Sequence, residues 1–376
     1  MLSIKEKITK NFINLTGWKT NQKYLIIESD DWGTIRMPSF GVYQELIKKG
    51  IPVDKFSFDK HDSLESQEDL ESLFRVLTSV EDKKGNPAVL TAFHVMANPN
   101  FEAIEKNGRT EYVFETILDT YKRNFHTQDT FKTIQNGMEL GVYFPQFHGR
   151  EHIHVKRWME AINSHSEKEQ IAFNYRAVIS TNSTQCLNPY IKNYFAGQDY
   201  SDTSEFKELE KINAEGLDLF EEIFGYKSLS FTAQGGIWGD HLLKTLSDKG
   251  VFLIGGRQFY PISEDKHKFI NKKKWGDKNE LGQIHWRRNC MFEPSRNQNF
   301  DWVSKCLAEI EIAFRWGKPA VISSHRENFI GSIFHENREQ SLRKLEILLT
   351  KVIRKWPDVQ FISTHQLAEI MNNSIN

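Results

Sequence analysis

Apolar and polar positions alternate along the chain in blocks that predict strands and helices in turn. Short apolar runs of strand length are separated by stretches in which apolar residues recur at helical spacing, as Phe131, Ile134 and Met138 do. The expected strands are Tyr24–Ile27, Val89–Phe93, Gly141–Phe147, Ser228–Thr232, Val251–Ile254, Ala320–Ser323 and Val359–Ser363. This alternation is typical of a parallel α/β architecture. We therefore expect about seven parallel strands in a single domain that spans residues 1–376.

The segment 155–225 departs from this alternation. It contains a polar stretch, 182–203, and then a helical pattern through Leu217, Phe220 and Ile223. We predict that the segment is a mostly helical or loop insertion that lies beside the sheet, as a lid does, and is not a separate domain.

Titratable residues collect directly after the expected strands. The set consists of Asp30, Asp31, His94, His148, His152, His325 and His365. In a βα barrel, the loops at the carboxyl ends of the strands share one face, and active sites lie there. In a doubly wound open sheet, ligands bind at the switch point of the strand order instead. In either fold this distribution indicates a site at the strand ends.

The bulk composition excludes some functions. Lys and Arg together number 49 and Asp and Glu 50, so there is no basic footprint for nucleic acid. The chain lacks an apolar run of about 18 residues, so we expect no membrane span. It begins without the continuous apolar stretch of a secretory signal. The cysteines Cys186, Cys290 and Cys306 show no disulfide framework and no zinc-finger spacing. We therefore predict a cytoplasmic protein.

The carboxylate pair Asp30-Asp31 ends the first expected strand. Adjacent residues that leave a strand point in different directions. One carboxylate can therefore bind a metal while the other faces the metal-bound water. Carboxylate oxygens suit zinc and similar ions. Aspartate is also common in turns, so the pair indicates a catalytic site only together with further ligands.

His148 and His152 supply such ligands after the third expected strand. A spacing of four residues puts both imidazoles on one face if a helix begins there. Two histidines and one aspartate leave a coordination position open for water, as catalytic zinc sites do. A bound metal lowers the pKa of this water to about 7, and a nearby carboxylate can take its proton. His325, which follows another apolar strand, could donate a proton to a leaving amine.

These residues resemble the polysaccharide deacetylase superfamily, the group with the NodB homology domain of carbohydrate esterase family 4. The first family motif, Thr-Phe-Asp-Asp, is matched by Glu28-Ser29-Asp30-Asp31. The second, His-Ser/Thr-x-x-His, is matched by His148-Gly149-Arg150-Glu151-His152 with the same histidine spacing. The last, Leu-x-His, is matched by Ile322-Ser323-Ser324-His325, which is one residue longer. The resemblance spans about Tyr24 to Leu367.

The resemblance implies a distorted (β/α) barrel and a metal-dependent amide or ester hydrolase. It implies that Asp30 is the general base and His325 the general acid. It also implies that Asp31, His148 and His152 bind one divalent metal ion, for which we expect zinc. We expect the substrate to contact residues beside the motifs, namely Trp32, Arg150, Gly235, Gly236, Trp238 and Arg326.

One family motif, Arg-x-Pro-Tyr, has no match. In the family it supplies an arginine that orients the base and a backbone N–H for the oxyanion. The corresponding segment, Phe231–Trp238, keeps a glycine pair but contains neither arginine nor proline. Arg287, Arg288 and Arg326 are the candidates for the missing positive charge. The chain is thus identified as a divergent member of the family.

The leading hypothesis is hydrolytic removal of an acyl group, first of all N-acetyl, from a sugar or glycan precursor. One alternative is an amidohydrolase of small non-sugar amides, because the superfamily includes such enzymes. Another is a glycan-binding barrel that has lost catalysis. The missing arginine favours this last reading, whereas the intact Asp30, Asp31, His148, His152 and His325 oppose it.

Overall fold

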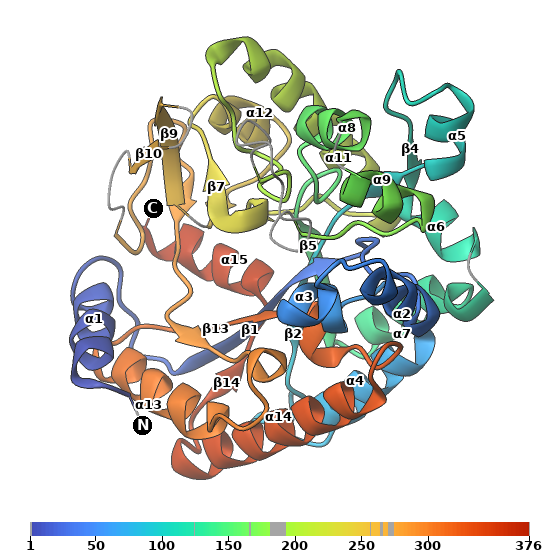
Figure 1. The fold of residues 1–376 in the computed structure, drawn as a ribbon. Helices are drawn as coiled ribbons and strands as arrows, with labels where there is room; N and C mark the ends of the chain where they lie inside the picture. Colours follow the sequence, from blue (N-terminus) through green and yellow to red (C-terminus); the bar gives the residue numbers. More distant parts are fainter. Residues whose placement is uncertain are drawn as a thin grey trace.

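The computed structural model describes residues 2–375 except 124, 165–166, 181–192, 256, 264–265 and 270–273. Its centre is one sheet in the order β11-β8-β6-β5-β2-β1-β13-β12, and β14 pairs with β1 outside this path. Every pairing in this sheet is parallel, and the sheet curls into a half-barrel with helices around it (Figure 1). The strands are β1 (Tyr24–Trp32), β2 (Leu90–His94), β5 (Tyr143–Phe147), β6 (Ser230–Phe231), β8 (Leu253–Ile254), β11 (Ile284–His285), β12 (Cys290–Met291), β13 (Ala320–His325) and β14 (Gln360–Phe361). The predicted distorted α/β barrel is confirmed.

The expected number of about seven strands is too low. All seven expected strands are present, and β11 and β12 are additional. Each of these two strands has 2 residues, which is too short to show any periodicity in the sequence. They form the two ends of the sheet path. The segment 286–289, which lies between them in the chain, therefore joins the two edges of the half-barrel.

Helices cover the sheet, and short strands lie beside it. The helices are α1 (Ile4–Leu15), α2 (Phe40–Lys48), α3 (Ser57–His61), α4 (Gln67–Thr78), α5 (Phe101–Lys106), α6 (Ile117–Arg123), α7 (Thr130–Glu139), α8 (Val155–Asn163), α9 (Glu167–Asn174), α11 (Phe206–Phe224), α12 (Leu242–Asp248), α13 (Trp302–Arg315), α14 (His335–Lys355) and α15 (Thr364–Ile375). One smaller sheet pairs β3 (Ala97–Pro99) with β4 (Phe114–Thr116), and in the other β9 (Arg257–Ser263) lies between β7 (Ile237–Trp238) and β10 (Lys266–Phe269). Over the described ranges, none of the helices has the length and apolar character that crossing a membrane requires.

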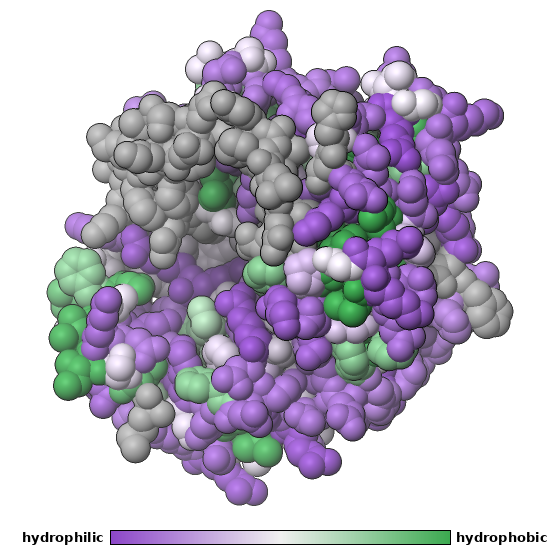
Figure 2. All heavy atoms as spheres, viewed as in Figure 1, coloured by the Kyte–Doolittle hydropathy of each residue, from purple (hydrophilic) through white to green (hydrophobic). Residues whose placement is uncertain are grey.

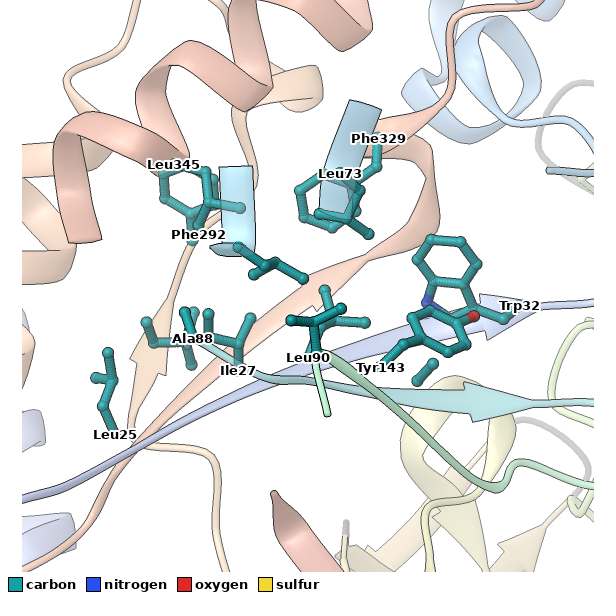
Figure 3. Close-up of a cluster of buried hydrophobic side chains, with 14 of the residues drawn as sticks. Leu25, Ile27, Trp32, Leu73, Ala88, Leu90, Tyr143, Phe292, Phe329 and Leu345 are labelled. Carbon is teal, nitrogen blue, oxygen red and sulfur yellow. The ribbon is translucent and has the colours of Figure 1, made fainter. Parts of the chain in front are cut away.

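The outer face of the sheet carries the largest apolar core. Leu25 and Ile27 of β1 share one buried cluster with Leu73 of α4 and Leu345 of α14. Figure 3 shows these side chains together with Trp32 at the end of β1. Full burial of a leucine or isoleucine side chain contributes about 1.5–3 kcal/mol. This packing therefore fixes the position of β1, which ends in the carboxylate pair.

The inner face carries a smaller core and then polar residues. Successive residues of a strand point to opposite faces. Ile26 therefore lies on the other side from Leu25 and Ile27, in a second cluster with Trp275 and Trp286. Glu28 has the same direction as Ile26, and its Oε1 accepts a hydrogen bond from Trp286 Nε1 at 3.0 Å. The alternation carries Asp30 to this inner face as well.

Residues 155–225 supply α8, α9 and α11. Helix α11 packs against α12 and against β5, so it belongs to the layer around the sheet. The assignment of this segment as an insertion or lid stays a prediction. Cys186 lies outside the described residues, whereas Cys290 and Cys306 are free and buried.

An apolar surface runs along α1. Ile4, Ile8 and Phe12 are 79%, 65% and 67% exposed, and Figure 2 shows hydrophobic atoms gathered over this helix at the left edge of the view. Together with Leu15 and Trp316 they line a groove. In Figure 1, α1 lies away from the carboxyl end of β1, so this groove is separate from the strand-end residues.

Candidate active site

The site begins with a bulge at the end of β1. The pairing of β1 with β2 shifts register between Ser29 and Trp32, and Asp31 has a positive φ of 76°. A left-handed conformation costs a residue other than glycine about 1–3 kcal/mol. Regular alternation would turn Asp31 outward with Ile27, but the bulge redirects the chain. Asp31 thereby reaches the histidines that follow β5, while Asp30 keeps its inward direction.

Trp32 anchors this bulge in the core. Its side chain is fully buried, its ring lies edge-on to Tyr143 with centroids 5.3 Å apart, and its Nε1 donates to Ser29 Oγ at 3.0 Å. The ring offers no exposed surface to a ligand here, and the contact of Trp32 with the substrate stays a prediction. Its role is to hold the strand end from which Asp30 and Asp31 project.

Three potential metal ligands converge beside the bulge. His152 Nε2 lies 2.8 Å from Asp31 Oδ1, and His148 Nε2 lies 3.4 Å from the same oxygen. One ligand atom from each residue lies within 4.8 Å of the others, and all three side chains are buried. The structure thus brings together the three residues that the sequence motifs marked as ligands.

The surroundings of these residues fit a metal cation. His148 Nδ1 lies 2.7 Å from the Thr232 carbonyl oxygen, so Nδ1 carries a proton and donates it. Nε2 of His148 then turns its lone pair towards Asp31 Oδ1. This nitrogen and this carboxylate oxygen are both acceptors, and they face each other favourably only with a cation between them. Burial lowers the pKa of His152, although Asp31 opposes this, which favours the neutral, metal-binding imidazole. One carboxylate and two neutral imidazoles are a ligand set that zinc accepts.

The ionisation of Asp31 agrees with this arrangement. Burial alone would raise the pKa of the carboxyl, but His152 and His148 hold it well below its ordinary value. Asp31 therefore remains a carboxylate near neutral pH and offers its oxygen as a ligand.

The loop after His148 positions the two histidines without a helix. A helix that began here would place both imidazoles on one face, but α8 begins only at Val155, and Gly149 has a φ of 112°. Gln234 holds the loop, since its Nε2 donates to the carbonyl oxygens of His148 and Glu151, the latter at 2.8 Å. A Cβ added at Gly149 would lie 1.7 Å from Gln234 Nε2. Gln234 is a positioning residue that the sequence pattern did not reveal.

Arg288 holds Asp30. Its Nη1 and Nη2 donate to the two carboxylate oxygens of Asp30 at 2.5 and 2.6 Å, and its Nε donates to Glu28 at 2.5 Å. Arg288 lies in the segment 286–289, which joins the two edges of the sheet. Burial would raise the pKa of Asp30, but Arg288, followed by His148, lowers it below its ordinary value. Of the three arginines considered for this place, Arg288 is the one that pairs with Asp30.

His325 faces Asp30 from the end of β13. His325 Nε2 lies 3.9 Å from Asp30 Oδ2, and its Nδ1 lies 2.6 Å from Glu293 Oε1. Asn328 donates to the other oxygen of Glu293 at 2.8 Å and so fixes that carboxylate. Burial disfavours the charged imidazole, but Glu293 outweighs burial and raises the pKa of His325 to about 10. His325 is therefore a protonated and oriented donor near neutral pH, and Glu293 is a second residue that the sequence did not reveal.

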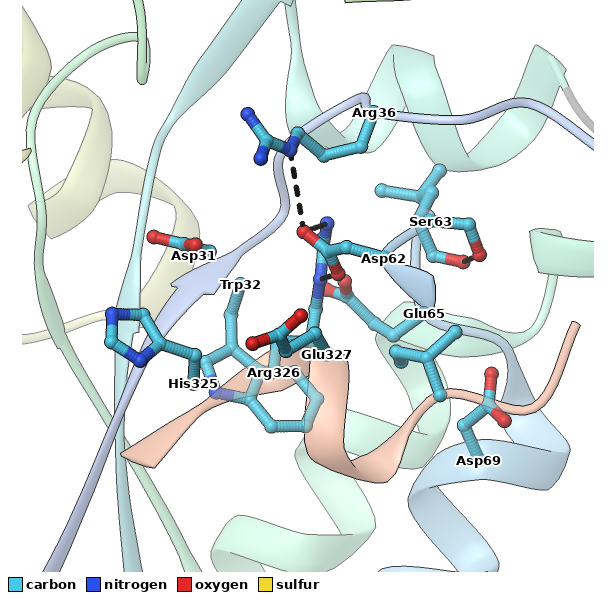
Figure 4. A network of polar contacts seen from close by, with 12 residues as sticks. Asp31, Trp32, Arg36, Asp62, Ser63, Glu65, Asp69, His325, Arg326 and Glu327 are labelled. Carbon is cyan, nitrogen blue, oxygen red and sulfur yellow. Dashed lines mark hydrogen bonds and ion pairs between the residues drawn. The ribbon is translucent and has the colours of Figure 1, made fainter. Parts of the chain in front are cut away.

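Arg326 belongs to a buried network beneath the site. Its Nε and Nη2 donate to Asp62 at 2.9 and 3.0 Å, and its Nη1 donates to Glu65 at 2.7 Å. Glu65 also accepts a hydrogen bond from the backbone N–H of Gly33 at 2.9 Å, directly after the bulge. Figure 4 shows Arg326 among these carboxylates. The guanidinium is fully buried and its donors fix the chain around the bulge, and its contact with the substrate stays a prediction.

The other predicted substrate contacts differ in their exposure. Arg150 is 5% exposed, and its Nε donates to Glu151 at 2.7 Å. Trp238 is fully buried. Both side chains are enclosed by protein, and their contact with the substrate stays a prediction. Gly235 is exposed and Gly236 half-buried, so their backbone stays accessible, and contact with the substrate there is a proposal.

Known protein families give no match at the level of sequence, because no family model and no curated protein matches the chain. Solved structures do match it. A protein from Parabacteroides distasonis, proposed to be a glycoside hydrolase or deacetylase, aligns with a TM-score of 0.51 and 10% identity, over 95% of this chain and 73% of that chain. The chain shares the fold of this protein.

Further solved structures match the chain with lower TM-scores. A proposed polysaccharide deacetylase from Mycobacterium smegmatis aligns with a TM-score of 0.46 and 11% identity, over 96% of this chain and 93% of that chain. One from Pseudomonas aeruginosa PAO1 aligns with the same score and identity, over 93% of this chain and 91% of that chain.

Proposed function

We propose that the chain is a metal-dependent hydrolase that removes an acyl group, first of all N-acetyl, from a sugar or glycan precursor. One observation carries the proposal, namely that three units meet at one end of the sheet. They are the ligand set Asp31–His148–His152, the pair Asp30–Arg288 and the pair His325–Glu293. Amide hydrolysis needs an activated water, a base for its proton and an acid for the leaving amine. The fold shared with a proposed glycoside hydrolase or deacetylase supports N-acetyl as the acyl group.

The metal site would be formed by Asp31, His148 and His152, with zinc as the proposed ion. A divalent metal held there supplies an activated water and polarises the amide carbonyl. Thr232 fixes one imidazole through its carbonyl oxygen, as second-sphere groups of metal sites do. Gln234 fixes the loop between the two histidines.

Asp30 and His325 divide the proton transfers between them. Asp30 takes a proton from the attacking water, and Arg288 keeps this carboxylate ionised and oriented. His325 donates its Nε2 proton to the nitrogen as the C–N bond breaks, and Glu293 stabilises the imidazolium before that step. Water and amide are thereby converted into a carboxylic acid and an amine. A backbone N–H near Gly235 is the proposed partner of the carbonyl oxygen.

Substitution of Asp30 tests this division of roles. In Asp30→Asn the metal ligands are unchanged, so metal content should equal that of the wild type. The rate of acetate release should fall by about 10²- to 10⁴-fold, which is the usual contribution of a general base. Asp218→Asn, an exposed aspartate on α11, is the matched control. Full turnover by Asp30→Asn would show that Asp30 is not the base.

A substrate panel separates the alternatives. It contains N-acetylated sugars, N-acetylated sugar nucleotides and small cyclic and linear amides, with acetate or amine release as the readout. Release from the sugars supports the proposal. Hydrolysis of the small amides alone would assign an amidohydrolase, and glycan binding by a metal-free protein without hydrolysis would assign a non-catalytic barrel.

A further inference from the structure

Arg36 has a buried guanidinium that forms an ion pair with Asp62, but its Nε makes no hydrogen bond within the described residues. The residue is 5% exposed, and its Nε lies 3.6 Å from Asp62 Oδ2, which is longer than a hydrogen bond. Asp62 already accepts two hydrogen bonds from Arg326. Within the described part of the chain, Arg36 Nε has no hydrogen-bond partner. Figure 4 shows the Arg36 side chain extending over Asp62 towards the side of Asp31.

Two phenylalanine rings hold this guanidinium at the candidate active site. Arg36 Cζ lies 4.1 Å from the ring centroid of Phe195 and 5.5 Å from that of Phe58. The Phe195 ring lies 5.5 Å from the His152 ring, and the Phe58 ring lies 5.1 Å from the His325 ring. Arg36 is therefore placed between a proposed metal ligand and the proposed acid.

The chemistry of a stacked guanidinium determines which ligand fits it. Rings next to its faces leave the in-plane N–H groups to make hydrogen bonds. These groups match the oxygens of a carboxylate or phosphate as a two-pronged donor. Leaving such donors unpaired in a buried place costs free energy, which a matching ligand would recover. Arg296, with its Cζ 5.7 Å from the Phe58 ring, adds a second positive charge nearby.

We propose that Arg36 forms a subsite for an anionic oxygen group of the substrate, next to the acyl group that is removed. The substrate class is then an N-acylated sugar that carries a carboxylate or a phosphate. This inference rests on the proposed hydrolase function and deepens it by naming the kind of sugar. It gives Arg36, whose Nε makes no hydrogen bond within the described residues, a second anionic partner besides Asp62.

Rates with matched substrates test the subsite. The neutral substrate is N-acetylglucosamine, the carboxylate substrate is an N-acetylated hexosaminuronic acid, and the phosphate substrate is N-acetylglucosamine 6-phosphate. The wild type should prefer one acidic substrate over the neutral one in kcat/KM by about 10- to 100-fold, as expected for charged hydrogen bonds. The substrate that is preferred identifies the anion as carboxylate or phosphate.

Variants of Arg36 connect this preference to the residue. In Arg36→Gln the ratio of acidic to neutral kcat/KM should fall by about tenfold or more, mainly through KM. Arg36→Lys, which keeps the charge but not the paired donors, should give an intermediate ratio. Arg343→Gln, an exposed arginine on α14, should keep the wild-type ratio. Equal rates for all three substrates, or an unchanged ratio in Arg36→Gln, would overturn the proposal.

Binding without turnover keeps this test separate from the proposed function. Glucuronic acid and inorganic phosphate are titrated by calorimetry into the wild type and into the Arg36→Gln variant. Cooperative unfolding of the variant first shows that it is folded. Binding of one anion that weakens about tenfold or more in the variant supports the subsite even if no acetate is released. Equal affinity in both proteins overturns the subsite even if the chain proves to be a deacetylase.

Discussion

Replacement of Arg288 by glutamine tests the coupling between Asp30 and the charge that holds it. The change removes two hydrogen bonds to Asp30 and one to Glu28, and it leaves both carboxyl groups buried, at 6% and 0% exposure. Loss of one partner from a buried ion pair costs about 3–5 kcal/mol. The Arg288 side chain keeps 17% exposure, so we expect the lower end, a fall of about 3 kcal/mol in the free energy of unfolding.

The pH dependence of the reaction should change with it. Burial raises and Arg288 lowers the pKa of Asp30, and the arginine outweighs burial in the wild type. Without Arg288 the pKa of Asp30 rises. Because the base acts in its ionised form, the acidic limb of kcat/KM should move to higher pH. The stability that the lowered pKa confers is present above the unfolded-state pKa and is lost as pH falls through the folded-state value, and the variant should lack this contribution.

Two measurements on matched variants decide the matter. Denaturant unfolding gives the free energy, and kcat/KM for acetate release as a function of pH gives the acidic limb. Arg288→Lys should restore part of both, because it returns the charge without the paired donors. Arg343→Gln is the control on the surface. An unchanged acidic limb together with wild-type stability in Arg288→Gln would refute the assignment of Arg288 as the residue that orients Asp30.

Two further predictions concern the loop and the acid. Gly149→Ala should lower the free energy of unfolding by about 1–3 kcal/mol and weaken metal binding. The reason is that φ is positive at this position and that the added Cβ would lie 1.7 Å from Gln234 Nε2. The control is Gly108→Ala, where φ is positive but the space is open, and calorimetric titration should show wild-type metal affinity for it. Equal losses of affinity in both variants would contradict the proposed role of the loop. Glu293→Gln should lower the pKa of His325 from about 10, which moves the basic limb of activity to lower pH, and an unchanged basic limb would argue against His325 as the acid. In the wild type the contribution of His325 to stability is present below about pH 6.5 and is lost as pH rises through about 10, so Glu293→Gln should abolish this loss in unfolding experiments.

The sequence predicted the strand ends because the strands are apolar runs, most of which stop at a titratable residue. Burial on both faces makes such runs visible, and their parallel order brings their ends together. Strands β11 and β12 were missed because two residues show no periodicity. Arg288 and Glu293 follow these short strands, so no pattern indicated where their side chains would lie. Arg288 could be named as one of three candidates, but not selected.

Local geometry limited the predictions within the site. The spacing of His148 and His152 would suit one face of a helix, whereas a left-handed Gly149 and the side chain of Gln234 bring the imidazoles together from a loop. Trp32 and Arg326 lie next to catalytic candidates in the chain, and we therefore expected them to contact substrate. Both are enclosed in the protein and support the bulge, because the neighbour of a functional residue on a strand end often points into the core.

The most direct test of the account is a metal-soaked crystal structure with anomalous diffraction at the zinc edge. We predict one strong anomalous peak within bonding distance, about 2.0–2.2 Å, of Asp31, His148 and His152. The peak should disappear in crystals of His152→Gln and remain in His335→Gln, an exposed histidine on α14. A wild-type crystal without a peak at these three residues, after soaking with zinc, would contradict the proposed metal-dependent hydrolase.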